Sequence, residues 1–160
     1  MGNQATCRKV KYIVSSCLAG LKTRYDGTDS LCEKVRELVK DGVAVPFCPE
    51  QEGGLPIPRE PAEIVGGCGR DVLYGNAKVI SQQGRDVTEK FIEGARRMLQ
   101  LARSLGISSA ILKSLSPSCG VKAIYDGTFS GNIVEGDGVA TALLREAGLT
   151  VVTEKELEND

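Results

Sequence analysis

The chain has 160 residues, which suits a single domain with a substantial buried core. We expect one domain over residues 1–160, with residues 1–9 as a loose N-terminal tail. Its 20 basic and 21 acidic side chains leave a formal charge of -1, which argues against a strong phosphate-binding surface. Aromatic residues make up 4% of the chain and tryptophan is absent, so a platform for stacking single-stranded bases is not expected. These two features argue against nucleic acid as a partner. No apolar run approaches the ~20 residues of a membrane span, so a membrane is not expected as a partner either.

Strand and helix signals alternate in the first part of the chain. Val10–Ser16 consists mostly of β-forming residues and predicts a buried strand. Ser30–Asp41 carries apolar residues at helical spacing and predicts a helix. Gly42–Cys48 predicts a second strand, in which Pro46 cannot donate to the ladder and is expected to end the pairing. The proline-rich segment Pro49–Pro61 predicts a long loop at a strand end, where α/β proteins place functional residues.

The same alternation continues toward the C-terminus. Lys78–Ser81 predicts a short strand, and Val87–Leu105 predicts the clearest helix because its apolar residues repeat at helical spacing. Ser108–Leu112 predicts the third main strand, Gly136–Ala147 the last helix and Leu149–Thr153 the final strand. This order predicts the α/β class: a parallel sheet with helices on both faces, a three-layer sandwich of Rossmann-like or flavodoxin-like type.

Three cysteines lie at or just past the ends of predicted strands: Cys17, Cys48 and Cys119. Because the carboxyl ends of parallel strands share one edge of the sheet, where ligands bind, we expect these thiols to face a common pocket. Thiolates select zinc, Cu(I) and iron–sulfur clusters, and the chain has no histidine to complete such a site. The alternative interpretation is that all three are buried or idle thiols.

The spacing of the cysteines bears on the kind of site. Disulfides would require an oxidising compartment, and the N-terminus MGNQATCRKVK has no apolar signal region, so a cytoplasmic location is expected. The close cysteine pairs typical of structural zinc sites are absent. Three ligands leave one metal position open, and in a four-iron cluster the iron at that position is a Lewis acid that favours sulfur or nitrogen ligands.

Polar residues accompany two of these cysteines. Glu50 follows Cys48 by two residues, and Ser116 and Ser118 precede Cys119. In the absence of histidine, Glu50 is the natural candidate for carrying a proton. The alternatives are a solvated loop acid for Glu50 and a turn-capping role for the two serines.

A tetrapeptide occurs twice, as Tyr25–Thr28 and as Tyr125–Thr128, both reading Tyr-Asp-Gly-Thr. Each copy follows one of the strand-end cysteines within a few residues. Asp-Gly is a common turn pair, so the repetition can be accidental. The sharper interpretation is that two similar loops form walls of the same pocket.

A series of segments carries the motifs of one known family: SSCLAG, RYDG, VPFCPE, GGLPIPREPAEI, DVT, AILKSLSPSCG, YDGTFSG and GDGVATALLREAG. They run from about Tyr12 to Thr153. On these motifs the chain resembles the DUF523 family, whose characterised members are thiouracil desulfidases. Together the motifs are highly specific.

The resemblance implies an α/β fold with a [4Fe-4S] cluster held by Cys17, Cys48 and Cys119. It implies that the fourth iron binds the sulfur of a thiocarbonyl and that Glu50 and Ser116 serve catalysis. The implied reaction removes sulfur from a small thiolated pyrimidine base, such as 2-thiouracil. Water supplies the replacing oxygen, sulfide is released, and the substrate undergoes no net redox change.

Three further residues have two interpretations each. Arg59 and Glu60, in the proline-rich segment, are candidates for contacting the polar edge of the substrate ring, or they form a surface ion pair. Cys68 departs from the family pattern and is either an incidental thiol or a resting fourth ligand. With a fourth ligand, the protein would be a non-catalytic iron–sulfur or sulfide carrier. An enzyme acting on thiolated RNA would need a basic surface or an added RNA-binding domain, and neither shows in the sequence.

Overall fold

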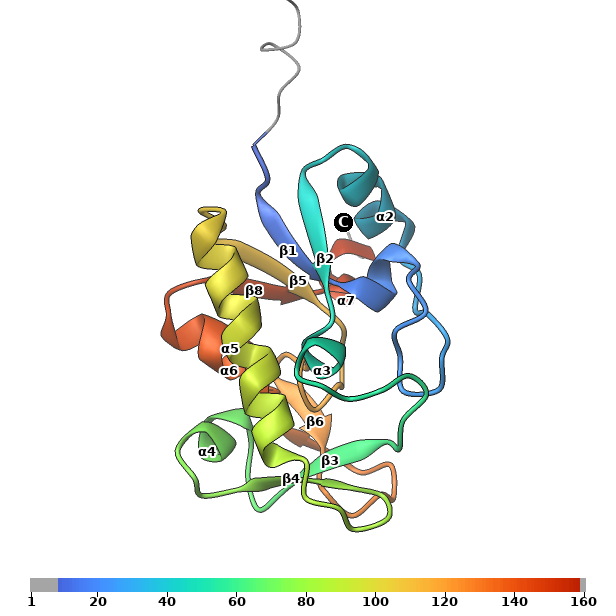
Figure 1. Cartoon of the computed structure of the whole chain (residues 1–160), viewed down its shortest axis with the longest axis vertical. Coiled ribbons are helices and arrows are strands. Elements are labelled where there is room, and N and C mark those ends of the chain that lie inside the picture. Colours follow the sequence, from blue (N-terminus) through green and yellow to red (C-terminus); the bar gives the residue numbers. More distant parts are fainter. Residues whose placement is uncertain (1–8, 159–160) are drawn as a thin grey trace, which may run out of the picture.

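The computed structural model of the chain, shown in Figure 1, describes residues 9–158. The expected tail over residues 1–9 therefore lies outside the described residues, apart from Lys9. The elements follow one another in this order: β1 (Tyr12–Ser15), a 3-10 helix η1 (Ser16–Ala19), α2 (Glu33–Lys40), β2 (Ala44–Phe47), α3 (Pro49–Glu52), β3 (Ala62–Val65), α4 (Gly69–Leu73), β4 (Lys78–Ser81), α5 (Thr88–Ser104), β5 (Ser109–Leu112), β6 (Ala123–Tyr125), β7 (Ile133–Glu135), α6 (Val139–Glu146), β8 (Thr150–Thr153) and α7 (Glu154–Glu158).

The main sheet has four strands in the order β2-β1-β5-β8, and every neighbouring pair is parallel. Successive residues of a strand face opposite sides of the sheet. Ile13 and Leu112 accordingly belong to the core that includes α5 and α6, whereas Val14 and Ile111 belong to the core that includes α2. Helices cover both faces, so the predicted α/β fold with a parallel sheet is confirmed (Figure 1).

The prediction that pairing ends at Pro46 is wrong. Val14 pairs with Pro46, and the register continues with Ser15 opposite Phe47. The physical reason is the place of β2 at the edge of the sheet, where a proline whose missing donor faces outward removes no ladder hydrogen bond.

Two small antiparallel sheets, β3–β4 and β6–β7, lie beyond the carboxyl ends of the parallel strands (Figure 1). Strand β4 coincides with the predicted strand Lys78–Ser81. Strands β3, β6 and β7 were not predicted. Of these, β3 and β6 matter for function because their residues line the space at the end of the main sheet.

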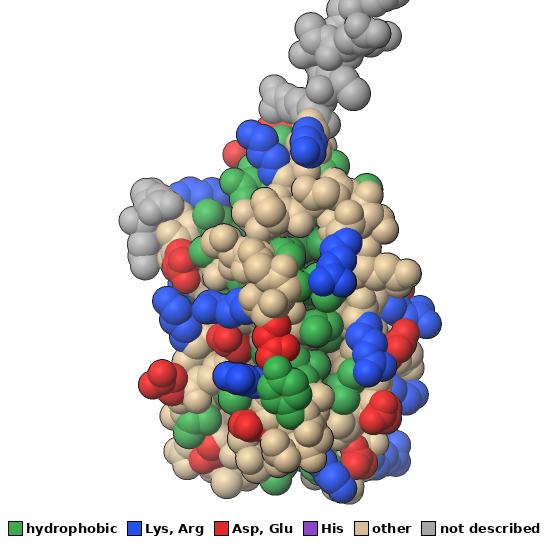
Figure 2. Space-filling view, turned by 90° about the vertical axis from the view of Figure 1, so that its left-hand side faces the viewer, with side chains coloured by type: hydrophobic (Ala, Val, Ile, Leu, Met, Phe, Trp, Pro, Cys, Tyr) green, Lys and Arg blue, Asp and Glu red, His purple; other side chains and the backbone are tan. Residues whose placement is uncertain are grey.

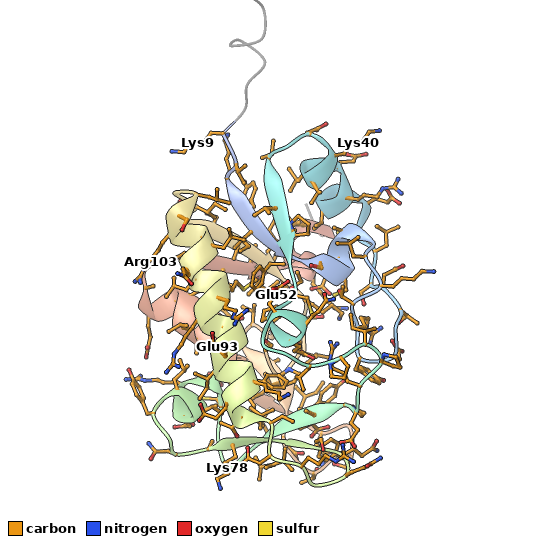
Figure 3. All side chains as sticks on the ribbon, viewed as in Figure 1. Lys9, Lys40, Glu52, Lys78, Glu93 and Arg103 are labelled. Carbon is orange, nitrogen blue, oxygen red and sulfur yellow. The ribbon has the colours of Figure 1, made fainter. Side chains whose placement is uncertain are left out.

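Helix α3 opens the segment predicted as a loop, and it packs directly on α5. A Cβ at Gly94 would lie 1.8 Å from Pro49 O, and a Cβ at Gly53 would lie 2.0 Å from Lys90 O. Glycine at both positions therefore lets the two backbones touch. Figure 3 labels Glu52 on α3, next to the middle of α5. This contact fixes the start of the proline-rich segment against the longest helix.

The surface mixes charges of both signs. Acidic and basic side chains are interspersed over the face in Figure 2. Arg103 points outward from α5 in Figure 3, on the solvent side of that helix. Among residues 9–158, we find no helix that combines the length and the apolar character needed to cross a membrane.

Candidate active site

A cavity of about 440 Å³ lies at the carboxyl edge of the parallel sheet, and it brings the three strand-end cysteines together. Glu50 and Ser116 line the same cavity as Cys17, Cys48 and Cys119. Four aromatic side chains also line it: Tyr25, Phe47, Tyr125 and Phe129. The space therefore combines soft thiols, a carboxyl group, a hydroxyl group and flat apolar walls.

Each cysteine is held by a different local structure. Cys17 lies in η1 directly after β1 and is buried, and its carbonyl accepts hydrogen bonds from the N–H groups of Gly20 and Ser30. Cys48 is the residue before α3, and its thiol lies 3.8 Å from Thr23 O. The thiols of Cys17 and Cys48 thus reach the cavity from two separate turns.

Cys119 is buried in the turn before β6 and is held by α6. The Thr141 hydroxyl donates to Cys119 O at 3.0 Å, and the N–H groups at the start of α6 donate to Pro117 O and Ser118 O. A Cβ at Gly138 would lie 2.5 Å from Ser118 O, so only glycine allows this approach. The helix terminus therefore fixes the backbone on which the third thiol stands.

Burial governs the acidity of these thiols. It raises the pKa of Cys17 to about 12, against the lowering effect of the nearby Lys113 and Arg24 cations. It also raises the pKa of Cys48 and Cys119. Negative charge on a neighbouring thiol of the set also raises the pKa of Cys17 and of Cys119. Without a bound cation, the thiols are therefore protonated at neutral pH, and a soft cation would favour the thiolates.

A compact hydrogen-bond network surrounds Glu50. Its Oε2 accepts from Arg59 Nε and Nη2, each at 2.9 Å, and its Oε1 accepts from Ser116 Oγ at 3.3 Å. Ser116 Oγ in turn accepts the N–H groups of Ser118 and Cys119, at 3.1 and 3.0 Å. The serine proton is consequently directed at the Glu50 carboxylate, and the network links the carboxylate to the backbone of a cavity thiol.

Arg59 is a positioning residue in this structure. Besides Glu50, its guanidinium donates to Thr23 O at 2.9 Å and to Pro56 O at 3.3 Å. Its side chain is 6% exposed. These hydrogen bonds argue against the predicted contact between Arg59 and a substrate ring, because the guanidinium donors are directed at acceptors of the protein.

Glu60, Cys68 and Ser118 do not line the cavity. The Glu60 carboxylate forms an ion pair with Arg85, whose Nε lies 3.6 Å from Glu60 Oε1. The alternative of a surface ion pair therefore holds for Glu60, but with Arg85 as the partner and not Arg59. The thiol of Cys68 donates to Asp71 Oδ2 at 3.3 Å at the start of α4, so a fourth cysteine ligand has no support in the structure. Ser118 is fully buried and its Oγ has no hydrogen-bond partner within residues 9–158.

Three charged residues that line the cavity were not predicted: Arg24, Glu63 and Lys113. Lys113 directly follows β5, and its Nζ lies 3.4 Å from Glu154 Oε2. Its place at a strand end is the signal that could have identified it. Glu63 lies on β3 and is buried, and its strand was itself not predicted.

The repeated tetrapeptides form two similar turns. Asp26 Oδ1 accepts the Thr28 N–H at 3.1 Å, and Asp126 Oδ1 accepts the Thr128 N–H at 3.0 Å. The tyrosine of each copy lines the cavity. The structure therefore favours the interpretation of two loops around one pocket.

Known proteins similar to this chain match it over most of its length. The model of a family described as 2-thiouracil desulfurase matches residues 12–156. A Bacillus subtilis (strain 168) protein, the uncharacterized YbbK, is 51% identical over 147 residues, which cover 92% of this chain and 97% of that protein. A solved structure described as the [4Fe-4S]-dependent thiouracil desulfidase TudS is 42% identical, with a TM-score of 0.82 over 94% of this chain and 95% of the other. The chain belongs to the 2-thiouracil desulfurase family, which is the DUF523 family that its motifs resemble.

Proposed function

We propose that this protein is a [4Fe-4S]-dependent desulfidase that removes the sulfur of a small thiolated pyrimidine base, with 2-thiouracil as the reference substrate. Membership of the family and the description of TudS support this activity. The observation that carries it is the joint lining of one cavity by three thiols and the hydrogen-bonded pair of Glu50 and Ser116.

The donor set fits an iron–sulfur cluster. Cys17, Cys48 and Cys119 are the cysteines that line the cavity, and the cations Lys113 and Arg59 partly oppose the rise in pKa that burial causes at Cys17 and Cys48, respectively. The chain has no histidine, and a set of thiols is a donor set that iron–sulfur clusters use, so these three side chains would hold a cluster.

When bound, a cluster with three protein ligands supplies an open Lewis-acidic iron for the soft sulfur of a thiocarbonyl. The reaction replaces C=S by C=O with the elements of one water molecule and yields hydrogen sulfide, without electron transfer. Glu50 accepts a proton from the attacking water and returns it to the departing sulfur. Ser116 donates a hydrogen bond that holds Glu50 Oε1 toward the cavity, and Arg59 holds Oε2.

The aromatic lining suits a flat ring. Tyr25 and Tyr125 come from the two similar loops, and Phe47 and Phe129 add apolar surface. Aromatic faces stack on planar rings, and a cavity of about 440 Å³ lies in the range of small-molecule sites. A free thiolated base is therefore the substrate class that this cavity favours.

An anaerobic turnover assay tests the proposal. After reconstitution with iron and sulfide, the protein is expected to convert 2-thiouracil into uracil and sulfide. Cys119→Ala should lose both the brown chromophore and turnover, because a proposed ligand is removed. The matched control is Cys68→Ala, which should keep both, because Cys68 lies outside the cavity. A chromophore that survives Cys119→Ala, or a loaded wild-type protein without turnover, would overturn the assignment.

A further inference from the structure

We infer that Glu63 determines specificity in the cavity by accepting a hydrogen bond from a ring N–H of the substrate, an inference that rests on the proposed function. Glu63 lies on β3, outside the parallel sheet that carries the strand-end cysteines. It lines the same cavity and is 9% exposed. No step proposed above uses it.

The two carboxylate oxygens of Glu63 have different surroundings. Oε1 accepts the N–H groups of Gly127 at 2.9 Å and Phe129 at 3.1 Å. Oε2 accepts no hydrogen bond from any residue between 9 and 158. Solvent reaches this oxygen in the ligand-free protein, because among residues 9–158 only Ser118 Oγ is both buried and without a hydrogen-bond partner. A ligand that excludes this solvent must offer an N–H donor in its place, since a carboxylate oxygen left buried and unpaired is costly in free energy.

The position of this carboxylate is fixed by the second Tyr-Asp-Gly-Thr loop. Its two bonds to Oε1 join β3 to the segment that carries Tyr125 and Phe129, both of which line the cavity. Gly127 has φ +94, and a Cβ there would lie 2.6 Å from Ile64 O, so the loop packs closely on β3. The acceptor and the aromatic wall are thus held in one fixed arrangement.

Glu50 is the other carboxylate that lines the cavity. Both oxygens of Glu50 accept hydrogen bonds, from Arg59 and from Ser116. Among the carboxylates that line the cavity, Glu63 is therefore the one with an oxygen that accepts no hydrogen bond from residues 9–158. A 2-thiouracil ring carries an N–H on each side of its thiocarbonyl, whereas an N-methylated ring loses one of these donors. A carboxylate oxygen, which can only accept, suits 2-thiouracil and discriminates against a ring whose matching N–H is replaced by a methyl group.

The experiment compares wild type with Glu63→Gln on 2-thiouracil and on its 1-methyl and 3-methyl derivatives. The glutamine oxygen can still accept the two loop N–H groups, but its amide nitrogen replaces the free acceptor by a donor. We expect KM for 2-thiouracil to rise roughly 10- to 100-fold with little change in kcat. Wild type should discriminate against at least one methyl derivative by a similar factor, and the variant should lose that discrimination. The matched control is Glu135→Gln, an exposed change on β7 that should leave all values unchanged.

Calorimetric titration with 2-thiouracil keeps this test separate from the proposed function. Weaker binding to Glu63→Gln than to wild type supports the role of Glu63 even if no sulfide is released. Equal binding, equal discrimination among the three compounds, or no binding to wild type would overturn it. Wild-type binding without turnover would instead count against the desulfidase assignment alone. A purely structural role for Glu63 would lower activity on all three compounds alike.

Discussion

Replacing Gly94 by alanine should damage both stability and activity, because α3 rests on α5 at this residue. An added Cβ would lie 1.8 Å from Pro49 O and 2.6 Å from Pro49 C. Ordinary contact begins at 3.4 Å, so the backbone of α3 would have to retreat by about 1.6 Å. Both crowded atoms belong to the backbone, so no side-chain rotation can relieve the contact.

The size of the effect follows from two opposing terms. Overpacking of this kind costs up to about 3 kcal/mol. Alanine in place of glycine inside a helix returns about 1 kcal/mol. The expected net loss in the free energy of unfolding is therefore about 2 kcal/mol. Because α3 carries Glu50 and directly follows Cys48, a shift of this size should also lower kcat/KM by about 100-fold.

Urea unfolding followed by circular dichroism measures the first effect, and sulfide release from 2-thiouracil measures the second. The matched control is Arg96→Ala, an exposed change on the same helix, which should alter the free energy of unfolding by less than about 0.5 kcal/mol. If Gly94→Ala proved as stable and as active as wild type, backbone contact between α3 and α5 could not be what positions Glu50.

Three further outcomes are expected. Glu50→Gln should keep the brown chromophore of the loaded protein and lower turnover by about 10²- to 10⁴-fold, because it removes the proton carrier; a fully active variant would contradict that role. Arg59→Lys should lower kcat and keep the chromophore, since one ammonium cannot reproduce the planar guanidinium that holds Glu50 and two carbonyls; an unchanged kcat would remove Arg59 from the positioning network. In the metal-free protein, iodoacetamide should alkylate Cys17 slowly at neutral pH and faster as pH rises, because its pKa is about 12 and only the thiolate reacts. Mass spectrometry of timed samples measures this rate, and alkylation as fast as that of an exposed thiol would contradict it.

The parallel sheet could be predicted because its signal is local and strong. Its strands are short apolar runs bounded by glycine or polar residues, and the helices between them repeat apolar residues at helical spacing. Strand β7 has no such signal, since all three of its residues are exposed and their pairing depends on β6. Nearby turns also lack the usual marker: Leu115, Lys122 and Phe129 adopt positive φ, and none of them is glycine. The small sheets therefore depend on tertiary contacts that sequence periodicity does not record.

The same distinction applies to the candidate site. Cys17 and Cys48 could be placed by strand ends, and Glu50 by its spacing from Cys48. The contact of Arg59 with Thr23 could not be predicted, because this partner is a backbone carbonyl supplied by a loop far from Arg59 in the sequence. Glu63 was missed because a carboxylate in a short strand is ordinarily taken as exposed, and only the loop at Gly127 explains its burial.

The site is assembled from two short units that each join a thiol to an oxygen group able to handle protons. Cys48 and Glu50 belong to the start of α3, which rests on α5. Ser116 and Cys119 belong to one turn, which α6 holds through its first N–H groups. The hydrogen bond between Ser116 and Glu50 joins these two units across the cavity. Because α5 and α6 pack against each other, their contact sets the distance between the units, and substitutions in that contact should change turnover without altering any group that touches the substrate.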